Sequence, residues 1–200
     1  VPLAGQMLLE GSAFVVTSVM MGWFGAEALA ANQVAMTYGS AAFMLTIALG
    51  SATTIRVSHC YGLRDRAQMR DAVVSSVHLA ALWGTIVFVL FIALRGVLPR
   101  LFTPSEPIIA LAAQMMIWVG LYQISDAVQG TLIGVLRGMQ DVKIIAALSF
   151  VAYVLLNIPV GYLFAFTFGF GSVGLLVGDV VGLSTAAVAY GIRVYRNLRS

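Results

Sequence analysis

Long uninterrupted apolar runs constrain this chain more than any other feature. They are about 20 residues or longer, the length that a helix needs to cross the hydrocarbon core of a bilayer. A membrane barrel would instead show shorter segments that alternate in polarity. The sequence therefore predicts an all-α polytopic membrane protein, a six-transmembrane-helix bundle with helices at roughly residues 2–24, 29–58, 72–94, 108–136, 142–168 and 173–195.

Composition supports this prediction and excludes a nucleic-acid partner. Hydrophobic residues make up 60% of the 200 residues and charged residues only 10%, and the mean hydropathy is +0.97. The sequence pI near 9.3 would indicate nucleic-acid binding in a soluble domain. Here the basic residues lie in the connections between apolar runs, so the partner that composition predicts is the lipid bilayer.

The basic residues also predict an orientation. Eleven are present, and only Arg95 and Arg100 lie in an odd-numbered connection. Because basic residues concentrate in cytoplasmic loops, we expect the even-numbered connections and both termini of this segment to be cytoplasmic. The residues on that side are Arg56, Arg64, Arg66, Arg70, Arg137, Lys143, Arg193, Arg196 and Arg199.

Two carboxylates, Glu10 and Asp126, interrupt apolar runs and require an explanation. An ionised group at membrane depth costs at least a few kcal/mol, so such groups usually face a cavity, a partner or a transported ion. At about 1.5 Å of rise per residue, the two lie at similar depths from the cytoplasmic ends of helices 1 and 4. If these helices are neighbours, the acids would share one site. The alternative is that each is protonated and hydrogen-bonded to a neighbouring helix.

Polar stripes on three predicted helices favour a shared internal cavity. Each stripe repeats at helical spacing, which places its members on one face. The candidate cavity-lining residues are Gln6 and Thr17 beside Glu10, Gln33, Thr37 and Ser40 on helix 2, and Tyr122, Ser125 and Gln129 beside Asp126. A negative cavity of this kind could exchange a proton or Na⁺ for a cationic solute, because both compete for the same carboxylates.

Three further features allow both a packing role and a functional one. Pro159 removes a backbone hydrogen bond inside helix 5 and is a candidate hinge. Asp179 on helix 6 could pair with a neighbouring helix or serve transport. Glycines four residues apart are expected to let helices approach closely; they are Gly130, Gly134 and Gly138, and Gly174, Gly178 and Gly182.

Enzyme chemistry is not predicted. We find no nucleotide-binding glycine loop, serine nucleophile motif or zinc motif. His59 and His78 have no neighbours at metal-ligand spacing. The chain begins at Val1-Pro2, without Met, and we interpret it as part of a longer polypeptide.

Five sequence runs occur in order along the chain, namely QMLLEGSAF, ALAANQVAM, IRVSHCYGLRD, LYQISDAVQGTLIGVLRGMQD and NIPVGYLF. They resemble the carboxyl-terminal half of multidrug and toxic compound extrusion (MATE) transporters, closest to the NorM-type branch. The resemblance implies that residues 1–200 are one six-helix lobe of a twelve-helix transporter of the cell (inner) membrane, with the amino-terminal lobe absent. It implies efflux of cationic amphiphilic small molecules coupled to Na⁺ or H⁺, with no cofactor. It also implies an ion site at Glu10, Tyr122 and Asp126, which would hold Na⁺ if the coupling ion is Na⁺.

Three alternatives stay open. A flippase for lipid-linked precursors, from the same wider superfamily, should line its cavity with Arg and Lys, and none lies within the predicted spans except near their ends. A non-transporting membrane scaffold should tolerate neutralisation of both acids. An intramembrane carboxylate enzyme should carry a second catalytic motif, and none is found.

Overall fold

The chain folds into a bundle of long helices in the computed structural model, which describes residues 2–199 except the side chains of residues 2–4, 6 and 7. No strand occurs in the described residues, so the predicted all-α membrane fold is confirmed. Five helical stretches are long and apolar enough to cross a membrane, and α1 adds a shorter apolar stretch, Leu8–Gly22. The helices are α1 (Pro2–Gly22), α2 (Ala26–Gly62), α3 (Arg66–Leu94), α4 (Glu106–Gly138), the stretch Lys143–Thr167 and α7 (Ser172–Arg199).

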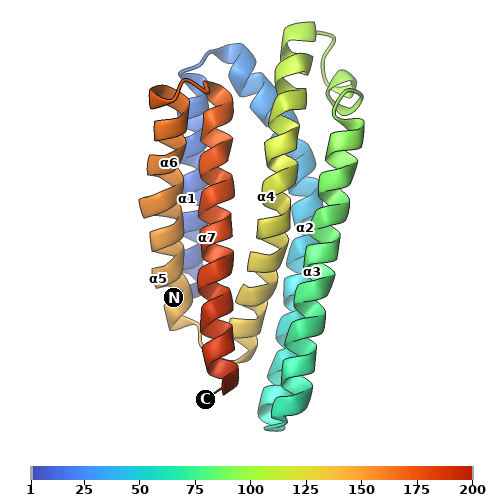
Figure 1. The fold of residues 1–200 in the computed structure, drawn as a ribbon, viewed down its shortest axis with the longest axis vertical. Coiled ribbons are helices and arrows are strands. Elements are labelled where there is room, and N and C mark those ends of the chain that lie inside the picture. The colour runs from blue at the N-terminus through green and yellow to red at the C-terminus, as the bar shows by residue number, and fades with distance from the viewer. Residues whose placement is uncertain (1, 200) are drawn as a thin grey trace.

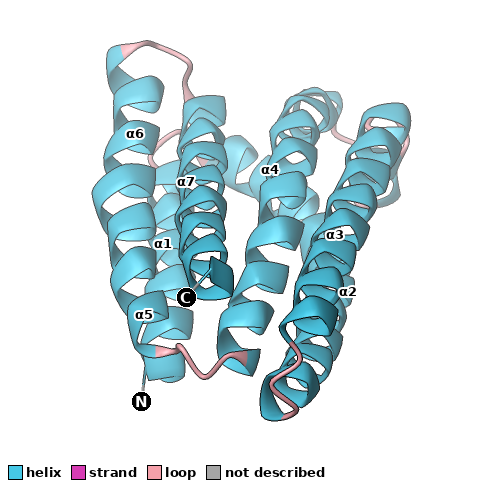
Figure 2. Cartoon of the chain, turned by 60° about the horizontal axis from the view of Figure 1, so that its bottom comes forward, coloured by secondary structure: helices cyan, strands magenta, loops and turns pink. Residues whose placement is uncertain are grey.

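Two groups of helices make up the bundle (Figure 1). Helices α2, α3 and α4 form one group, and α1, α7 and the stretch Lys143–Thr167 form the other. The second view separates the same two groups, and α4 and α7 pack against each other between them (Figure 2). The space where the groups meet is therefore bounded by helices from both halves of the chain.

The described ends of the helices differ from the predicted ones mainly around the second connection. We predicted helices over residues 29–58 and 72–94, whereas α2 continues to Gly62 and α3 begins at Arg66, so the polar residues of this connection extend the two long helices. Asp65 caps α3, because its carboxylate accepts a hydrogen bond from the backbone N–H of Gln68 at 2.9 Å.

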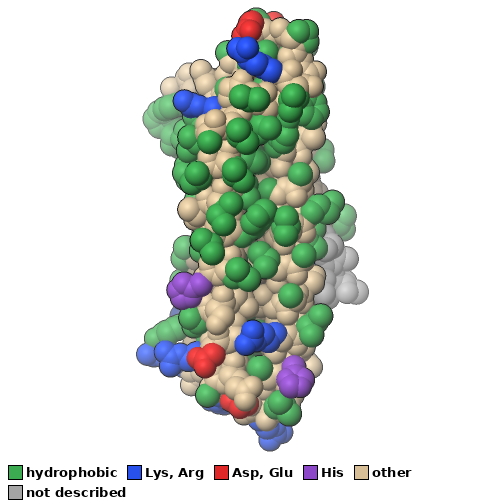
Figure 3. Space-filling model, turned by 90° about the vertical axis from the view of Figure 1, so that its right-hand side faces the viewer, with side chains coloured by type: hydrophobic (Ala, Val, Ile, Leu, Met, Phe, Trp, Pro, Cys, Tyr) green, Lys and Arg blue, Asp and Glu red, His purple; other side chains and the backbone are tan. Residues whose placement is uncertain are grey.

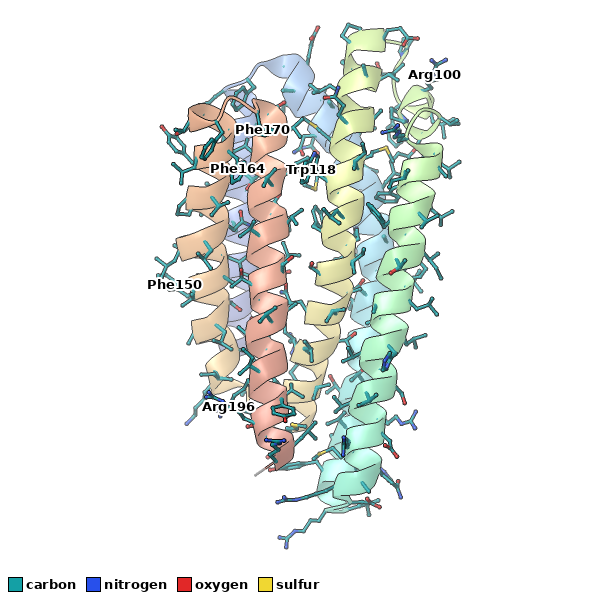
Figure 4. All side chains as sticks on the ribbon, viewed as in Figure 1. Arg100, Trp118, Phe150, Phe164, Phe170 and Arg196 are labelled. Atoms are coloured by element: carbon teal, nitrogen blue, oxygen red, sulfur yellow. The ribbon has the colours of Figure 1, made fainter. Side chains whose placement is uncertain are left out.

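Charged side chains gather at the two ends of the bundle. One face shows apolar side chains along its length between charged ends (Figure 3). Arg100 and Arg196 lie at opposite ends (Figure 4). The α2–α3 and α4–α5 connections lie at the same end as the carboxyl terminus, as the basic residues predict (Figure 1). Which compartment this end faces stays a prediction.

Glycines on α4 allow its backbone to touch that of α2. A Cβ on Gly134 would overlap the backbone of Gly50, and the Thr54 hydroxyl contacts the carbonyl oxygens of Gly50 and Gly134 at 2.9 and 3.0 Å. A Cβ on Gly138 would lie 2.9 Å from the Val57 side chain. The prediction that these glycines serve close packing is confirmed.

The stretch Lys143–Thr167 is a continuous helix that contains two π-helical segments. It consists of α5 (Lys143–Ser149), the π-helix η2 (Phe150–Asn157), α6 (Ile158–Tyr162) and the π-helix η3 (Leu163–Thr167). Pro159 is in the first turn of α6. Its missing N–H therefore falls at the junction where the hydrogen-bond pattern changes. Whether this junction is a hinge stays a prediction.

The end of α7 is attached to the α4–α5 connection through Asp141. The Arg193 Nε donates a hydrogen bond to Asp141 Oδ2 at 2.6 Å, and the Asn197 side-chain amide donates to the same oxygen at 2.8 Å. The hydrogen bond from Arg193 holds the pKa of Asp141 below its usual value. The carboxylate form of Asp141 therefore stabilises this end of the bundle.

Replacing Asp141 by Asn is expected to lower the midpoint of thermal unfolding slightly at pH 7. A carboxylate whose pKa is depressed by folding stabilises the protein above its unfolded pKa, near 4, and loses that effect as the pH falls through its folded pKa. The difference between Asp141→Asn and the parent should therefore shrink below about pH 4. Unfolding in detergent at a series of pH values measures this, with Asp71→Asn, an exposed acid of α3, as control. An equal difference at every pH would contradict the expectation.

Candidate functional site

A cavity of about 540 Å³ lies between α1, α2 and α4. Glu10 of α1 and Asp126 of α4 both line it, although more than a hundred residues separate them in the chain. Helix α1 contacts α2 along part of its length, and α4 packs extensively on α2. The structure thus places the two sequence-predicted acids at one site.

Asp126 faces the cavity without a hydrogen bond to any described residue. Its exposed fraction is 5%, and the Glu10 carboxylate acts on it electrostatically. Glu10 is half-buried and also interacts electrostatically with Arg137. The alternative, in which a protonated Asp126 bonds to a neighbouring helix, has no partner among the described residues. Asp126 instead lines the cavity, where a cation or water could reach it.

Tyr122 lies one helical turn before Asp126 on the same cavity wall. Its hydroxyl donates a hydrogen bond to the Met36 sulfur at 3.3 Å, and its ring lies 6.4 Å from that of Phe14. Because the hydroxyl proton points to the Met36 sulfur, the lone pairs of the hydroxyl oxygen could bind a cation between Glu10 and Asp126. Tyr122 is positioned for either an oxygen or an aromatic contact.

Three of the other seven predicted lining residues reach the cavity. Gln33 and Ser40 line it from α2, and Gln129 lines it from α4. Gln129 is held in place by a hydrogen bond from its amide nitrogen to the Tyr153 hydroxyl at 2.5 Å. These residues extend the polar surface on both sides of the acids.

Three predicted lining residues lie elsewhere, so their assignment is corrected. Ser125 exchanges a hydrogen bond of 2.8 Å with Ser184 of α7. Thr37 is exposed, and its hydroxyl bonds to the Gln33 carbonyl. Thr17 is buried beside Asp179. The side chain of Gln6 lies outside the described residues.

Arg137 is a lining residue that our sequence reasoning did not assign to the cavity. It lines the cavity near the end of α4, whereas we grouped it only with the basic residues of the cytoplasmic side. A signal was present, because Arg137 follows Asp126 by eleven residues and therefore lies about 20° from it around the helix. Apolar side chains complete the wall, notably Phe14, Met36, Phe43 and Ile133.

Charge and shape together define what the cavity can bind. Two acids and one base leave one net negative charge when all three are ionised. Among the described residues, no group of three or more His, Cys, Asp or Glu side chains could hold a metal ion. The aromatic and methionine wall offers an adaptable apolar surface beside the acids. These properties suit a monovalent cation or an organic cation with apolar parts.

The fold and the site define a helical multi-pass membrane protein with an acidic internal cavity. A family model described as MatE matches residues 2–163. The chain belongs to the MatE family.

Similar proteins agree with this assignment. The chain is 36% identical over 200 residues to the multidrug resistance protein NorM of Vibrio vulnificus (strain YJ016), covering 97% of this chain and 43% of that protein. It is 29% identical over 198 residues to the multidrug resistance protein MdtK of Proteus mirabilis (strain HI4320), covering 97% and 43%. The chain therefore spans less than half the length of these relatives.

Solved structures show the same fold. The crystal structure of the eukaryotic MATE transporter AtDTX14 matches with a TM-score of 0.86 and 26% identity, over 99% of this chain and 46% of that one. An outward-facing MATE transporter of the MOP superfamily matches with a TM-score of 0.85 and 21% identity, over 97% and 43%.

Proposed function

We propose that this lobe is half of a cation-coupled exporter of cationic amphiphilic molecules, in which Glu10 and Asp126 bind the coupling ion, Na⁺ or H⁺. The observation that supports this most is the buried Asp126 carboxyl, which lines the cavity with Glu10 and has no hydrogen bond to a described residue. Two carboxylates that repel each other gain from a cation or a proton placed between them.

The net charge of the cavity supports binding of one monovalent cation at a time. Arg137 offsets one of the two acids, so a single bound cation or proton brings the site to neutrality. An organic cation that enters from the cytoplasm between this lobe and an amino-terminal lobe would compete for the same charge. Loading of the coupling ion from outside would then favour release of the organic cation, through alternating access.

The apolar wall supports organic cations as the exported class. Phe14 and Tyr122 present rings to the cavity, and Met36 adds a polarisable sulfur. Aromatic faces attract cations, and methionine adapts its shape to irregular apolar groups. The relatives named multidrug resistance proteins support the same class.

Arg137 gives some support to a second candidate, a flippase for lipid-linked anions. A basic side chain in the cavity could bind a phosphate group. Two acids line the same cavity, however, and would repel that group. Export of cations is therefore the function that the charges favour.

Counterflow in proteoliposomes tests the proposal. A polypeptide with both lobes is reconstituted, ethidium is added, and an Na⁺ gradient or a pH gradient is imposed in separate runs. We expect one of the two gradients to drive ethidium against its concentration gradient. The double variant Glu10→Gln, Asp126→Asn is the control and should show no driven movement. Ethidium movement that neither gradient drives, or gradient-driven movement of an anionic lipid instead, would contradict the proposal.

A further inference from the structure

Asp179 is a third intramembrane acid, and it does not line the cavity of Glu10 and Asp126. It lies in α7 with an exposed fraction of 0%. The Asn157 side-chain amide of η2 donates a hydrogen bond to its Oδ1 at 3.0 Å, and the Thr17 hydroxyl of α1 interacts with the same carboxyl group. Three elements from distant parts of the chain therefore meet at this acid.

The surroundings of Asp179 leave little room for water. A Cβ on Gly178 would lie 2.6 Å from the Asn157 carbonyl oxygen and from the Gly161 Cα. A Cβ on Gly182 would lie 2.6 Å from the Asn157 Cβ. The backbone of α7 thus packs directly on η2 and α6 on both sides of Asp179 along the chain.

No cation among the described residues pairs with Asp179. Arg100 pairs with Glu106 and Arg193 with Asp141, and Arg137 interacts electrostatically with Glu10. The neighbours from α1 and η2, Thr17 and Asn157, are uncharged, and from α4 the titratable Tyr122 interacts electrostatically with it. Oδ2 of Asp179 has no hydrogen-bond partner among the described residues. A buried carboxylate without a cation is strongly disfavoured, so this geometry suits the neutral acid.

We propose that Asp179 is a proton-binding site, separate from the cavity acids, that carries its proton on Oδ2 in this packing. Loading takes one proton from water onto the carboxylate and forms one O–H bond. Unloading reverses that step when α1 and the π-helical segment η2 draw away from α7 and admit water.

The elements around the site favour such exchange. The π-helices η2 and η3 flank Pro159 next to the contact, and π-helical turns, which bond i to i+5, are rare and frequently occur at functional sites. Asn157, the last residue of η2, is the one that donates to Asp179. Tyr122 lines the cavity and interacts electrostatically with both Asp126 and Asp179, so it is within electrostatic reach of both sites. The proposal does not depend on the transported substrate.

Infrared spectroscopy of the full-length protein in nanodiscs tests it. A protonated carboxyl group gives a carbonyl band that shifts on exchange from H₂O to D₂O. In the double variant Glu10→Gln, Asp126→Asn we expect such a band to remain, to weaken between pH 5 and 9, and to be lost when Asp179→Asn is added. Proton uptake over the same pH range should fall by about one per polypeptide with Asp179→Asn.

Two further variants keep the result interpretable. Asp71→Asn removes an exposed acid of α3 and should leave the band unchanged. Thr17→Val preserves the shape of a neighbour and should shift the band without removing it, which tests the site even if Asp179→Asn does not fold. A spectrum that neither Asp179→Asn nor Thr17→Val alters, or a band from Asp179 that is constant from pH 5 to 9, would overturn the proposal. A failure of the ethidium experiment would leave this result unaffected, so the two proposals fail separately.

Discussion

Efflux of a fluorescent organic cation is expected to fall to the background rate when Glu10 is replaced by Gln, or Asp126 by Asn, in a polypeptide that carries both lobes. Either change removes one of the two negative charges of the cavity, while Arg137 still contributes its positive charge. The remaining net charge is about zero, so the electrostatic attraction that concentrates a cation at the site is lost. Each substitution preserves the size of the side chain. Ethidium efflux from intact cells, divided by the amount of protein in the membrane, measures the effect.

Matched controls separate the site from a general loss of acidic side chains. Glu106→Gln and Asp71→Asn make the same chemical changes at exposed positions of α4 and α3, and both should leave efflux unchanged. Normal efflux in both Glu10→Gln and Asp126→Asn would contradict the site. The same outcome would favour a scaffold that tolerates neutral residues there.

Gly134→Ala is expected to destabilise the lobe severely. The added Cβ would overlap the backbone oxygen of Gly50, and backbone atoms cannot rotate aside as a side chain can. Helices α2 and α4 would have to separate, which would also disturb the Thr54 hydroxyl that contacts both carbonyls. Overpacking of this kind costs roughly 1–3 kcal/mol or more. The yield of monodisperse protein and the midpoint of thermal unfolding in detergent measure the loss.

Gly22→Ala is the matched control, because a Cβ on Gly22 of α1 would meet nothing within 4 Å. Its yield and unfolding midpoint should match those of the parent. A Gly134→Ala protein as stable as this control would show that α2 and α4 can adjust their spacing freely, contrary to the packing that the structure describes.

The fold follows from the sequence more completely than the helix ends do. Apolar runs of spanning length predict the helices because the bilayer requires all backbone groups to be bonded within a helix. Outside the membrane, water can bond the backbone groups, so the apolar runs no longer determine where a helix ends. Local capping by residues such as Asp65 decides where α3 begins, and we therefore predicted its start at residue 72 instead of Arg66.

The site was predicted only in part because a helical wheel gives direction around one helix and not the neighbour at each depth. Glu10 and Thr17 share a face of α1, yet Glu10 lines the cavity while Thr17 interacts with Asp179 of α7. Ser125 is adjacent to Asp126 in sequence, but it lies on a different side of α4 and forms a hydrogen bond with Ser184. The role of Tyr122 came only from resemblance to a family, since its residue type alone does not distinguish an ion ligand from a packed ring.

The helix with two π-segments has a further consequence for how the lobe is built. Every fourth residue along it is buried, namely Ile145, Ser149, Tyr153, Asn157, Gly161 and Ala165. In a regular α-helix five steps of four residues would rotate by about 200°, so one end of this row would face lipid. The π-helical turns advance less around the axis per residue and cancel that rotation. The buried row therefore stays on one side of the helix. Converting either π-segment into α-helix would rotate the residues beyond it away from α7.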